Sequence, residues 1–249
     1  MSANRFVWYE LVTRDVDAAI GFYGKLLGWQ SQDHPGGGER YAVLSASGKG
    51  VGGAMRLPEG VPDPCWTGYV GTPDIEATVE GFRKAGGAVH RGPWDIPEVG
   101  RLAIVGDPQG VVLALIQSAS DRPSEAFNQQ LPGHGSWHEL HTPDPDGAFR
   151  FYNEQFGWTK GHSMDMGPMG TYQLFKAGDT EIGGMRRVAD GMSPMWLYYF
   201  GVRSIDGAVA CVRENGGEVL HEPHEVPGGA MIISARDPQG AMFALVGPN

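Results

Sequence analysis

The residues with the clearest capacity for chemistry lie in two short segments that are near copies of each other. The tetrapeptides WYEL and WHEL each place a glutamate two residues after a tryptophan, Glu10 after Trp8 and Glu139 after Trp137. Residues two apart in a strand share one face of the sheet. We therefore predict that each glutamate lies beside its tryptophan on one face, which His141 extends in the second copy.

Two interpretations of these glutamates remain open. A carboxylate on the inner face of a sheet is costly unless it is paired or used, so Glu10 and Glu139 are candidate general bases or anchors for a ligand hydroxyl or amine. Their presence in both copies favours the alternative of a structural carboxylate bonded to arginine or backbone. Glu139 and His141 have a spacing that can chelate a metal, but a complete site needs His221 or His224 from a loop. Solvent-exposed or capping histidines are the alternative.

Aromatic residues and methionines are the candidate lining of a pocket. Trp8 and Trp137 are either walls of a flat binding site or plain core. The other candidates of this kind are Tyr69, Trp196, Tyr199, Met164, Met166 and Met169. Flexible thioethers suit an adaptable apolar pocket, although they also fill domain contacts. The matching loop of the first half, DHPGGGER, is polar and glycine-rich. We expect the second half to hold the better small-molecule site.

The similarity extends over the whole chain. From Trp8 to Trp29 and from Trp137 to Trp158, 11 of 22 aligned positions are identical. The segments VGGAMR, DPQG and a further tryptophan also return in order in the second half. Such self-similarity indicates a tandem duplication. We predict domains at 1–118 and 134–249, joined by a polar linker, 119–133, that contains two prolines.

A finer repeat is present inside each half. Residues 6–12 have the composition of a strand, and apolar residues then recur at helical spacing until Gly28. Three short strand-like segments follow, and the pattern restarts near Trp66. This predicts four β-α-β-β-β modules paired into two α+β domains. Each domain is expected to form an eight-stranded open barrel-like sheet with helices outside and a pocket inside.

Composition excludes several classes of protein. The chain has 249 residues, 41% hydrophobic, with a formal charge of −10 and no dense basic run, which argues against a nucleic-acid partner. No apolar run approaches the roughly 20 residues that span a bilayer, and no signal-like segment precedes the first strand. Cys65 and Cys211 are not equivalent in the repeat, so we expect no disulfide and a cytoplasmic protein, either a monomer or a homodimer.

The order of these motifs resembles the vicinal oxygen chelate superfamily, which includes glyoxalase I, bleomycin-resistance proteins and extradiol dioxygenases. The doubled WxEL form is similar to tandem glyoxalase-like proteins of the actinobacterial "hydroxylase" type. The resemblance implies a divalent metal held by His or Glu on the first and last strands of the modules. The corresponding positions here are Trp8, Thr67, Ala114, Trp137, Leu197 and Ala244. These residues are poor ligands or none, so we expect no metal there and no other cofactor.

The expected function follows from both arguments. The protein is expected to bind a small organic metabolite in a barrel cavity. If it is an enzyme, its chemistry is that of a lyase, an isomerase or a tailoring reaction, with Glu139, Glu10 and His141 as the candidate catalytic residues and without the usual metal ligands. The alternative is a non-catalytic protein that sequesters its ligand, as bleomycin-resistance proteins do.

Overall fold

The computed structural model describes residues 4–34 and 39–249, so residues 35–38 of the glycine-rich loop lie outside the described part. The chain follows the predicted four modules. The first contains β1 (Phe6–Thr13), α1 (Val16–Leu27), β2 (Gln30–Asp33), β3 (Tyr41–Ala46) and β4 (Lys49–Arg56). The second contains β5 (Cys65–Gly71), α2 (Ile75–Lys84), β6 (Ala88–Ile96), β7 (Gly100–Gly106) and β8 (Val112–Ser118). The third contains β9 (Gly135–Thr142), α3 (Pro145–Phe156), β10 (Thr159–Asp165), the 3₁₀ turn η1 (Gly167–Met169), β11 (Thr171–Ala177) and β12 (Thr180–Arg187). The fourth contains β13 (Met195–Gly201), α4 (Ile205–Glu214), β14 (Glu218–Glu225), β15 (Met231–Arg236) and β16 (Met242–Gly247).

The strands form two mixed sheets of eight. The first has the order β2-β3-β4-β1-β5-β8-β7-β6, and the second has the order β10-β11-β12-β9-β13-β16-β15-β14. Within each module the first and last strands pair in parallel, and the remaining pairs are antiparallel. Neither sheet closes into a barrel. This confirms the α+β fold with two tandem eight-stranded open sheets.

Local sequence explains where the helices begin and end. Asp15 precedes α1 in an extended conformation, and its carboxylate accepts the backbone N–H of Ala18 at 3.0 Å. Asp144 caps α3 in the same way. Gly28 and Gly157 end these helices with φ of 70° and 67°, a left-handed conformation that favours glycine. The repeated Asp and Gly positions are therefore helix signals.

Internal contacts divide the chain into two compact units that interleave along the sequence. One comprises Met1–Val7, Gly68–Ser124 and His138–Leu197, and the other comprises Trp8–Thr67, Glu125–Trp137 and Tyr198–Asn249. Each unit therefore combines a module from one half of the repeat with a module from the other half.

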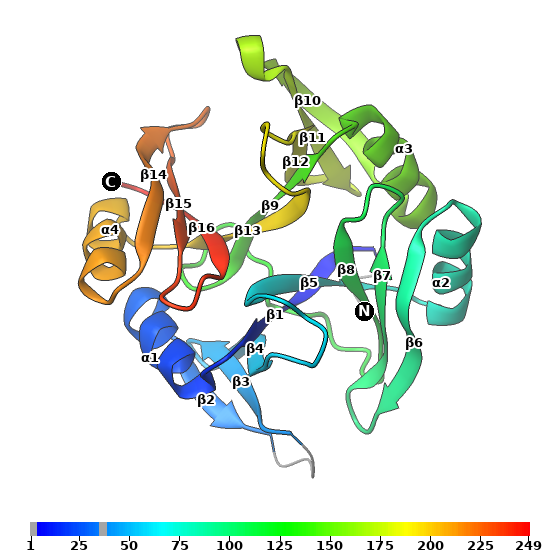
Figure 1. Ribbon diagram of the computed structural model, residues 1–249, viewed down its shortest axis with the longest axis horizontal. Coiled ribbons are helices and arrows are strands. Elements are labelled where there is room, and N and C mark those ends of the chain that lie inside the picture. Colours follow the sequence, from blue (N-terminus) through cyan, green and yellow to red (C-terminus); the bar gives the residue numbers. More distant parts are fainter. Residues whose placement is uncertain (1–3, 35–38) are drawn as a thin grey trace. The chain divides into compact units, whose positions relative to one another are not determined.

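The repeat also contains an FY motif, at 22–23 and 151–152, and the DPQG motif lies at 107–110 and 237–240. In the unit that contains α1 and α4, the first FY motif contacts the second DPQG motif. The Tyr23 hydroxyl on α1 donates to Asp237 Oδ2 at 3.1 Å and accepts from Trp66 Nε1 at 2.9 Å. The Gln239 side chain both accepts from the N–H and donates to the carbonyl of Asp15, each at 2.7 Å. The α1 helix lies beside α4 (Figure 1). Lys25 Nζ at the end of α1 donates to Oδ1 of Asn215, the residue that follows α4. The turn after β15 thus secures the start of a helix from the other half of the sequence.

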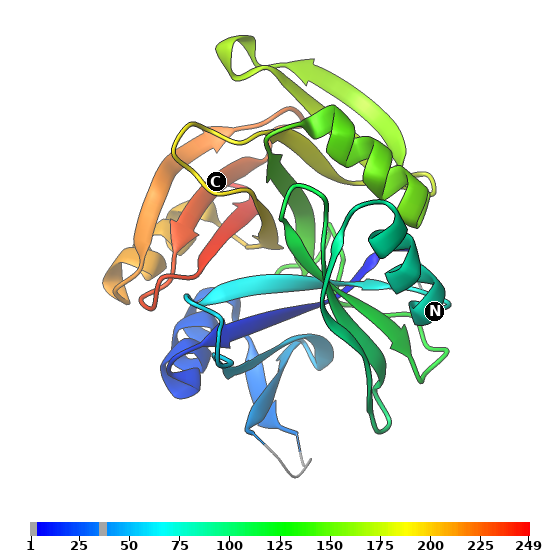
Figure 2. The same ribbon diagram turned by 45° about the vertical axis from the view of Figure 1, so that its right-hand side comes forward.

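The unit that contains α2 and α3 repeats this arrangement. The Tyr152 hydroxyl donates to Asp107 Oδ2 at 3.0 Å, and Gln109 bonds to the backbone of Asp144 in both directions. Helices α2 and α3 lie side by side (Figure 2), with the rings of Phe82 and Phe151 4.9 Å apart. The FY and DPQG motifs, which are repeated in both halves, therefore form hydrogen bonds that hold two modules together.

Within the part of the chain that the structure describes, none of the helices has the length and apolar character needed to cross a membrane.

Candidate functional site

Strand β9 brings Glu139 and His141 together on one face. His141 Nε2 lies 2.6 Å from Glu139 Oε1, and the two side chains are only 12% and 10% exposed. Strand β9 is buried along most of its length, with Trp137 and His141 partly exposed, and Glu139 and His141 share a face because they are two residues apart. The predicted juxtaposition of these two residues is therefore present, and it forms a buried acid–base pair.

Tyr172 on β11 completes this pair, and a glycine makes room for it. The Tyr172 hydroxyl donates to Glu139 Oε2 at 3.0 Å. Gly184 on β12 is in register with Glu139, and a Cβ at Gly184 would lie 2.3 Å from Cζ of the tyrosine ring. The ring therefore crosses the strand over a residue that has no side chain. Tyr172 was not predicted as a site residue, although its equivalence to Tyr41 in the repeat was a usable signal.

Arg186 is the fourth member of the site. It is in register with His141 on the parallel pair β9–β12. Its positive charge contributes to lowering the pKa of Glu139. Its guanidinium donates to Met169 Sδ at 3.3 Å, which places η1 at the edge of the site. We call Glu139, His141, Tyr172 and Arg186 the Glu139 cluster.

The cluster keeps Glu139 ionised. Burial raises the pKa of this carboxyl, but the contact with His141, the hydrogen bond from Tyr172 and the charge of Arg186 together outweigh burial and lower the pKa. A carboxylate held against an imidazole fixes the orientation of the ring and stabilises its protonated form. The pair can thus accept a proton from a bound molecule.

His138 lies on the opposite face of β9, as the alternation predicts, and belongs to the core. It is fully buried and stacks on Phe6 with ring centroids 3.9 Å apart. Its Nδ1 lies 2.6 Å from the Ile182 carbonyl oxygen, and the desolvation of its ring lowers its pKa to about 3.

The first half keeps the Glu–Tyr part of this arrangement and lacks the charged part. Burial raises the pKa of Tyr41 well above its usual value, and the adjacent charge of Glu10 raises it further. Trp8 Nε1 donates to the Tyr41 hydroxyl at 2.8 Å. The register pair that corresponds to His141 and Arg186 is Val12 with Met55. The two halves therefore differ in the chemistry of this one register pair.

The remaining predicted ligand residues are dispersed. Trp196 is buried and donates through Nε1 to the Tyr152 hydroxyl, so it is part of the core. Tyr69 and Tyr199 are also buried, while Trp137 and Met164 are partly buried. Met166 and Met169 are exposed, and the bond from Arg186 connects Met169 to the cluster.

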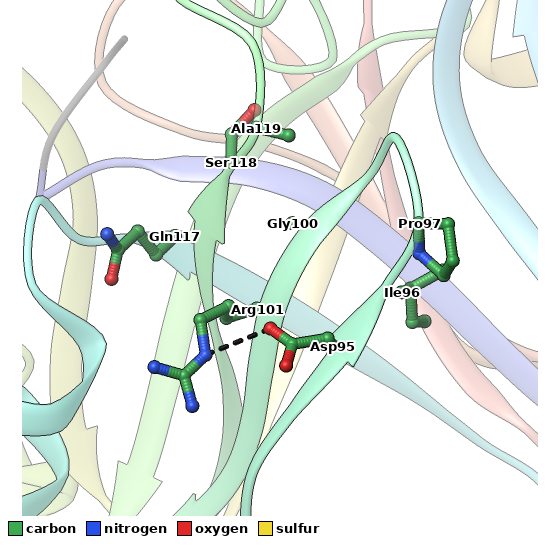
Figure 3. A pocket seen from close by; sticks show the side chains of 8 residues that line it. All are labelled: Asp95, Ile96, Pro97, Gly100, Arg101, Gln117, Ser118 and Ala119. Carbon is green, nitrogen blue, oxygen red and sulfur yellow. Dashed lines mark ion pairs between the residues drawn. The ribbon is translucent and has the colours of Figure 1, made fainter.

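A separate hollow of about 360 Å³ lies at the β6–β7 hairpin and the end of β8 (Figure 3). Arg101 and Gln117 are among its lining residues. Arg101 is already paired with Asp95 at 3.0 Å and with Glu76 at 2.8 Å. Its charge is neutralised by these partners, so this hollow is a weaker candidate than the Glu139 cluster.

Comparison with known proteins identifies the family. The family model described as the Glyoxalase/Bleomycin resistance protein/Dioxygenase superfamily matches residues 5–115 and 136–245. The chain belongs to this superfamily. A curated relative of Mycobacterium tuberculosis, CFP32, which is provisionally named a glyoxylase, is 34% identical over 97% of this chain and 94% of its own. The anthracycline biosynthesis protein DnrV of Streptomyces peucetius is 31% identical over 96% of this chain and 91% of its own.

Solved structures of the superfamily have the same fold. The Mn(II)-bound glyoxalase of Novosphingobium aromaticivorans matches with a TM-score of 0.71 at 14% identity, covering 98% of this chain and 82% of that one. The 2,3-dioxygenase LapB of Pseudomonas sp. KL28 matches with a TM-score of 0.69 at 14% identity, covering 98% and 92%. At this identity the match shows the fold alone.

The metal of such superfamily members does not fit this chain. The expected ligand positions on the last strands β8 and β16 are Ala114 and Ala244, which lie beside Tyr69 and Tyr199. Their methyl groups cannot coordinate a metal ion. In the described ranges, no group of three or more His, Cys, Asp or Glu side chains is arranged to hold a metal ion. The Glu139–His141 pair alone supplies two ligands, fewer than the three protein ligands of a typical catalytic zinc site.

The close approach of Tyr172 to Gly184 makes a specific prediction. We expect Gly184→Ala to push the ring away from Glu139 and to lower the free energy of unfolding by about 1–3 kcal/mol, the usual cost of overpacking. The measurement is urea denaturation of G184A, Y172A and the double mutant. Because the clash needs the ring, G184A should have little effect in the Y172A background. An equal effect in both backgrounds would assign the cost to the backbone instead.

Proposed function

We propose that the protein binds a small oxygenated organic metabolite at the Glu139 cluster and moves a proton on it without a bound metal. The observation that carries this proposal is the 2.6 Å contact between buried Glu139 and His141. General acid–base catalysis requires a proton acceptor that is positioned and correctly charged. His141 is the proposed acceptor, Glu139 orients it, and Tyr172 holds Glu139.

The reaction class that suits this pair is removal of a proton next to a carbonyl group, as in a lyase or an isomerase. The imidazole takes the proton from carbon, an enol or enolate forms, and the proton returns at the same or a neighbouring atom. The names of two relatives support the ligand class, since one refers to a glyoxylase and the other to anthracycline biosynthesis. Both names concern small oxygen-rich organic molecules.

The second candidate function is non-catalytic binding of such a molecule. It is favoured by the methyl side chains of Ala114 and Ala244 at positions where superfamily enzymes are expected to hold metal ligands. Proton exchange separates the two candidates. The wild type in D₂O should exchange the α-protons of dihydroxyacetone faster than H141N does, as followed by NMR. Equal exchange in the two proteins would favour pure binding.

The binding site itself is tested by paired variants of the two halves. We expect Glu139→Gln to weaken binding of a fluorescent anthracycline by at least about tenfold, or roughly 1.4 kcal/mol, because the charge that holds His141 in place is lost. Glu10→Gln should change affinity by less than about threefold and should mainly lower the melting temperature. Fluorescence titration gives both affinities. Equal losses would indicate two working sites, and a loss only in E10Q would place the site in the first half.

A further inference from the structure

Arg186 lies at the Glu139 cluster without a strong protein acceptor for its guanidinium. The only hydrogen-bond acceptor of its guanidinium among the described residues is the Met169 thioether at 3.3 Å. A thioether is a weak acceptor, whereas a guanidinium carries five N–H donors that suit carboxylates. Within the described ranges no carboxylate forms an ion pair with Arg186. Most of its N–H groups therefore have no protein acceptor among the described residues.

Some arginines of the chain pair with carboxylates, whereas others, such as Arg56 and Arg187, form no ion pair with a described residue. Arg101 contacts two carboxylates, and Arg40 also contacts two, at 2.8 and 3.1 Å. Arg213 and Arg236 each pair with a glutamate. Arg186 differs from these four paired arginines in two respects: its acceptor is a thioether, and its charge acts on the carboxylate of the acid–base pair.

The repeat shows that this arginine is a feature of one half only. The parallel pair β1–β4 has Val12 in register with Met55, and the parallel pair β9–β12 has His141 in register with Arg186. Both members of an apolar pair have been replaced by polar, chargeable residues. The scaffold folds with the apolar pair, so the charged pair points to a ligand rather than to the fold.

From this geometry we infer that Arg186 binds the carboxylate of an anionic organic ligand. This inference rests on the proposed function, because it assigns the charge of the molecule bound at the Glu139 cluster. One carboxylate oxygen of Glu139 contacts His141, and the other accepts the hydrogen bond of the Tyr172 hydroxyl. The Arg186 guanidinium is therefore available to bind a ligand. Bidentate Arg–carboxylate contacts add geometric specificity as well as energy.

Met169 is the group that the ligand displaces from Arg186. It belongs to η1, which begins at Gly167 (φ 61°) and is followed by Gly170 (φ 80°). Met169 is 51% exposed, so its side chain can turn into solvent when a ligand carboxylate takes the place of its sulfur at Arg186. Exposed Met166 on the same turn can then contact the apolar part of the ligand.

The test uses two probes of the same shape and different charge, benzoate and benzamide, in calorimetric or saturation-transfer titrations. The wild type should bind benzoate at least about tenfold more tightly than benzamide, a difference of roughly 1.4 kcal/mol. Arg186→Met, which installs the residue of the first half, should reduce the preference for benzoate over benzamide to less than about twofold. Arg187→Met, at the adjacent exposed arginine, is the matched control and should keep the preference.

The outcomes separate this inference from the proposed function. Equal affinity for the two probes, no measurable binding of benzoate, or a preference that survives in R186M would overturn the role of Arg186. Loss of the preference in R187M to the same degree would also overturn it, since a general surface charge would then explain the binding. If E139Q weakens both probes while R186M keeps the preference, the proposed function stands and this inference fails. If E139Q has no effect while R186M loses the preference, the inference stands and the role of Glu139 fails.

Discussion

The protein is expected to lose stability steadily as the pH falls from about 6.5 toward 3, because folding buries His138 in its neutral form. The His138 ring on β9 is fully buried, and its desolvation lowers its pKa from 6.5 to about 3. Below pH 6.5 the unfolded chain binds a proton at this residue that the folded chain does not bind. Acid therefore favours the unfolded state.

The size of the effect follows from the pKa difference. Each pH unit between the two pKa values changes the free energy of unfolding by about 1.4 kcal/mol, so the full shift corresponds to about 4–5 kcal/mol. Glu139 acts in the same direction at lower pH. Its lowered pKa gives a stabilisation that is present above its ordinary value of 4.5 and is lost as the pH falls through the folded value. The interval between pH 5 and 6.5 therefore isolates His138.

Urea unfolding of the wild type and of H138N at several pH values in this interval checks the prediction. Asparagine retains a donor that can reach the Ile182 carbonyl and has no titrating group. Between pH 6.5 and pH 5 we expect the wild type to lose about 1.5–2 kcal/mol more than H138N loses, because the slope reaches its full value only below the unfolded pKa. Parallel pH profiles for the two proteins would show that His138 is protonated in the folded state as readily as in the unfolded state.

The second large effect is expected from Asp237→Ala. Asp237 is buried, accepts the Tyr23 hydroxyl, and also accepts the backbone N–H groups of Gln239 and Ala241 at 2.8 and 3.0 Å. Alanine leaves these buried donors without an acceptor, and each such loss costs about 1–3 kcal/mol. We expect a total loss of about 3–5 kcal/mol, which is large for a single substitution.

Chemical denaturation of D237A measures this loss, with exposed Asp190→Ala as the control that should stay within about 0.5 kcal/mol of the wild type. Asp107→Ala should behave like D237A, because Asp107 receives the Tyr152 hydroxyl and two backbone N–H groups in the same manner. A cost of less than about 1 kcal/mol in D237A would mean that the FY and DPQG motifs do not brace the modules.

Features of the fold that depend on local periodicity could be predicted from the sequence. The two-residue alternation placed Glu139 beside His141 and His138 behind them. The glycine signal at Gly28 located the end of α1. The repeat length gave the modules and the two sheets. These features depend only on the spacing of residues close together in the sequence, so the sequence pattern is sufficient to predict them.

Features that depend on strand register or on distant contacts could not be predicted in this way. Tyr172 reaches Glu139 only because β11 and β12 pair in a register that lays its ring over Gly184. Neither residue is near Glu139 in the sequence. The pairing of the FY and DPQG motifs across the two halves is of the same kind, because it joins residues more than a hundred positions apart, such as Tyr23 and Asp237. Arg186 was missed because its significance appears only when His141 is seen as its register partner.

Native mass spectrometry of the full chain with a saturating anthracycline tests most directly whether the second half alone is the functional half. We expect one ligand per chain in the wild type, retained in E10Q and lost in E139Q. Two ligands per chain in the wild type, or one ligand that persists in E139Q and disappears in E10Q, would contradict the assignment of function to the Glu139 cluster.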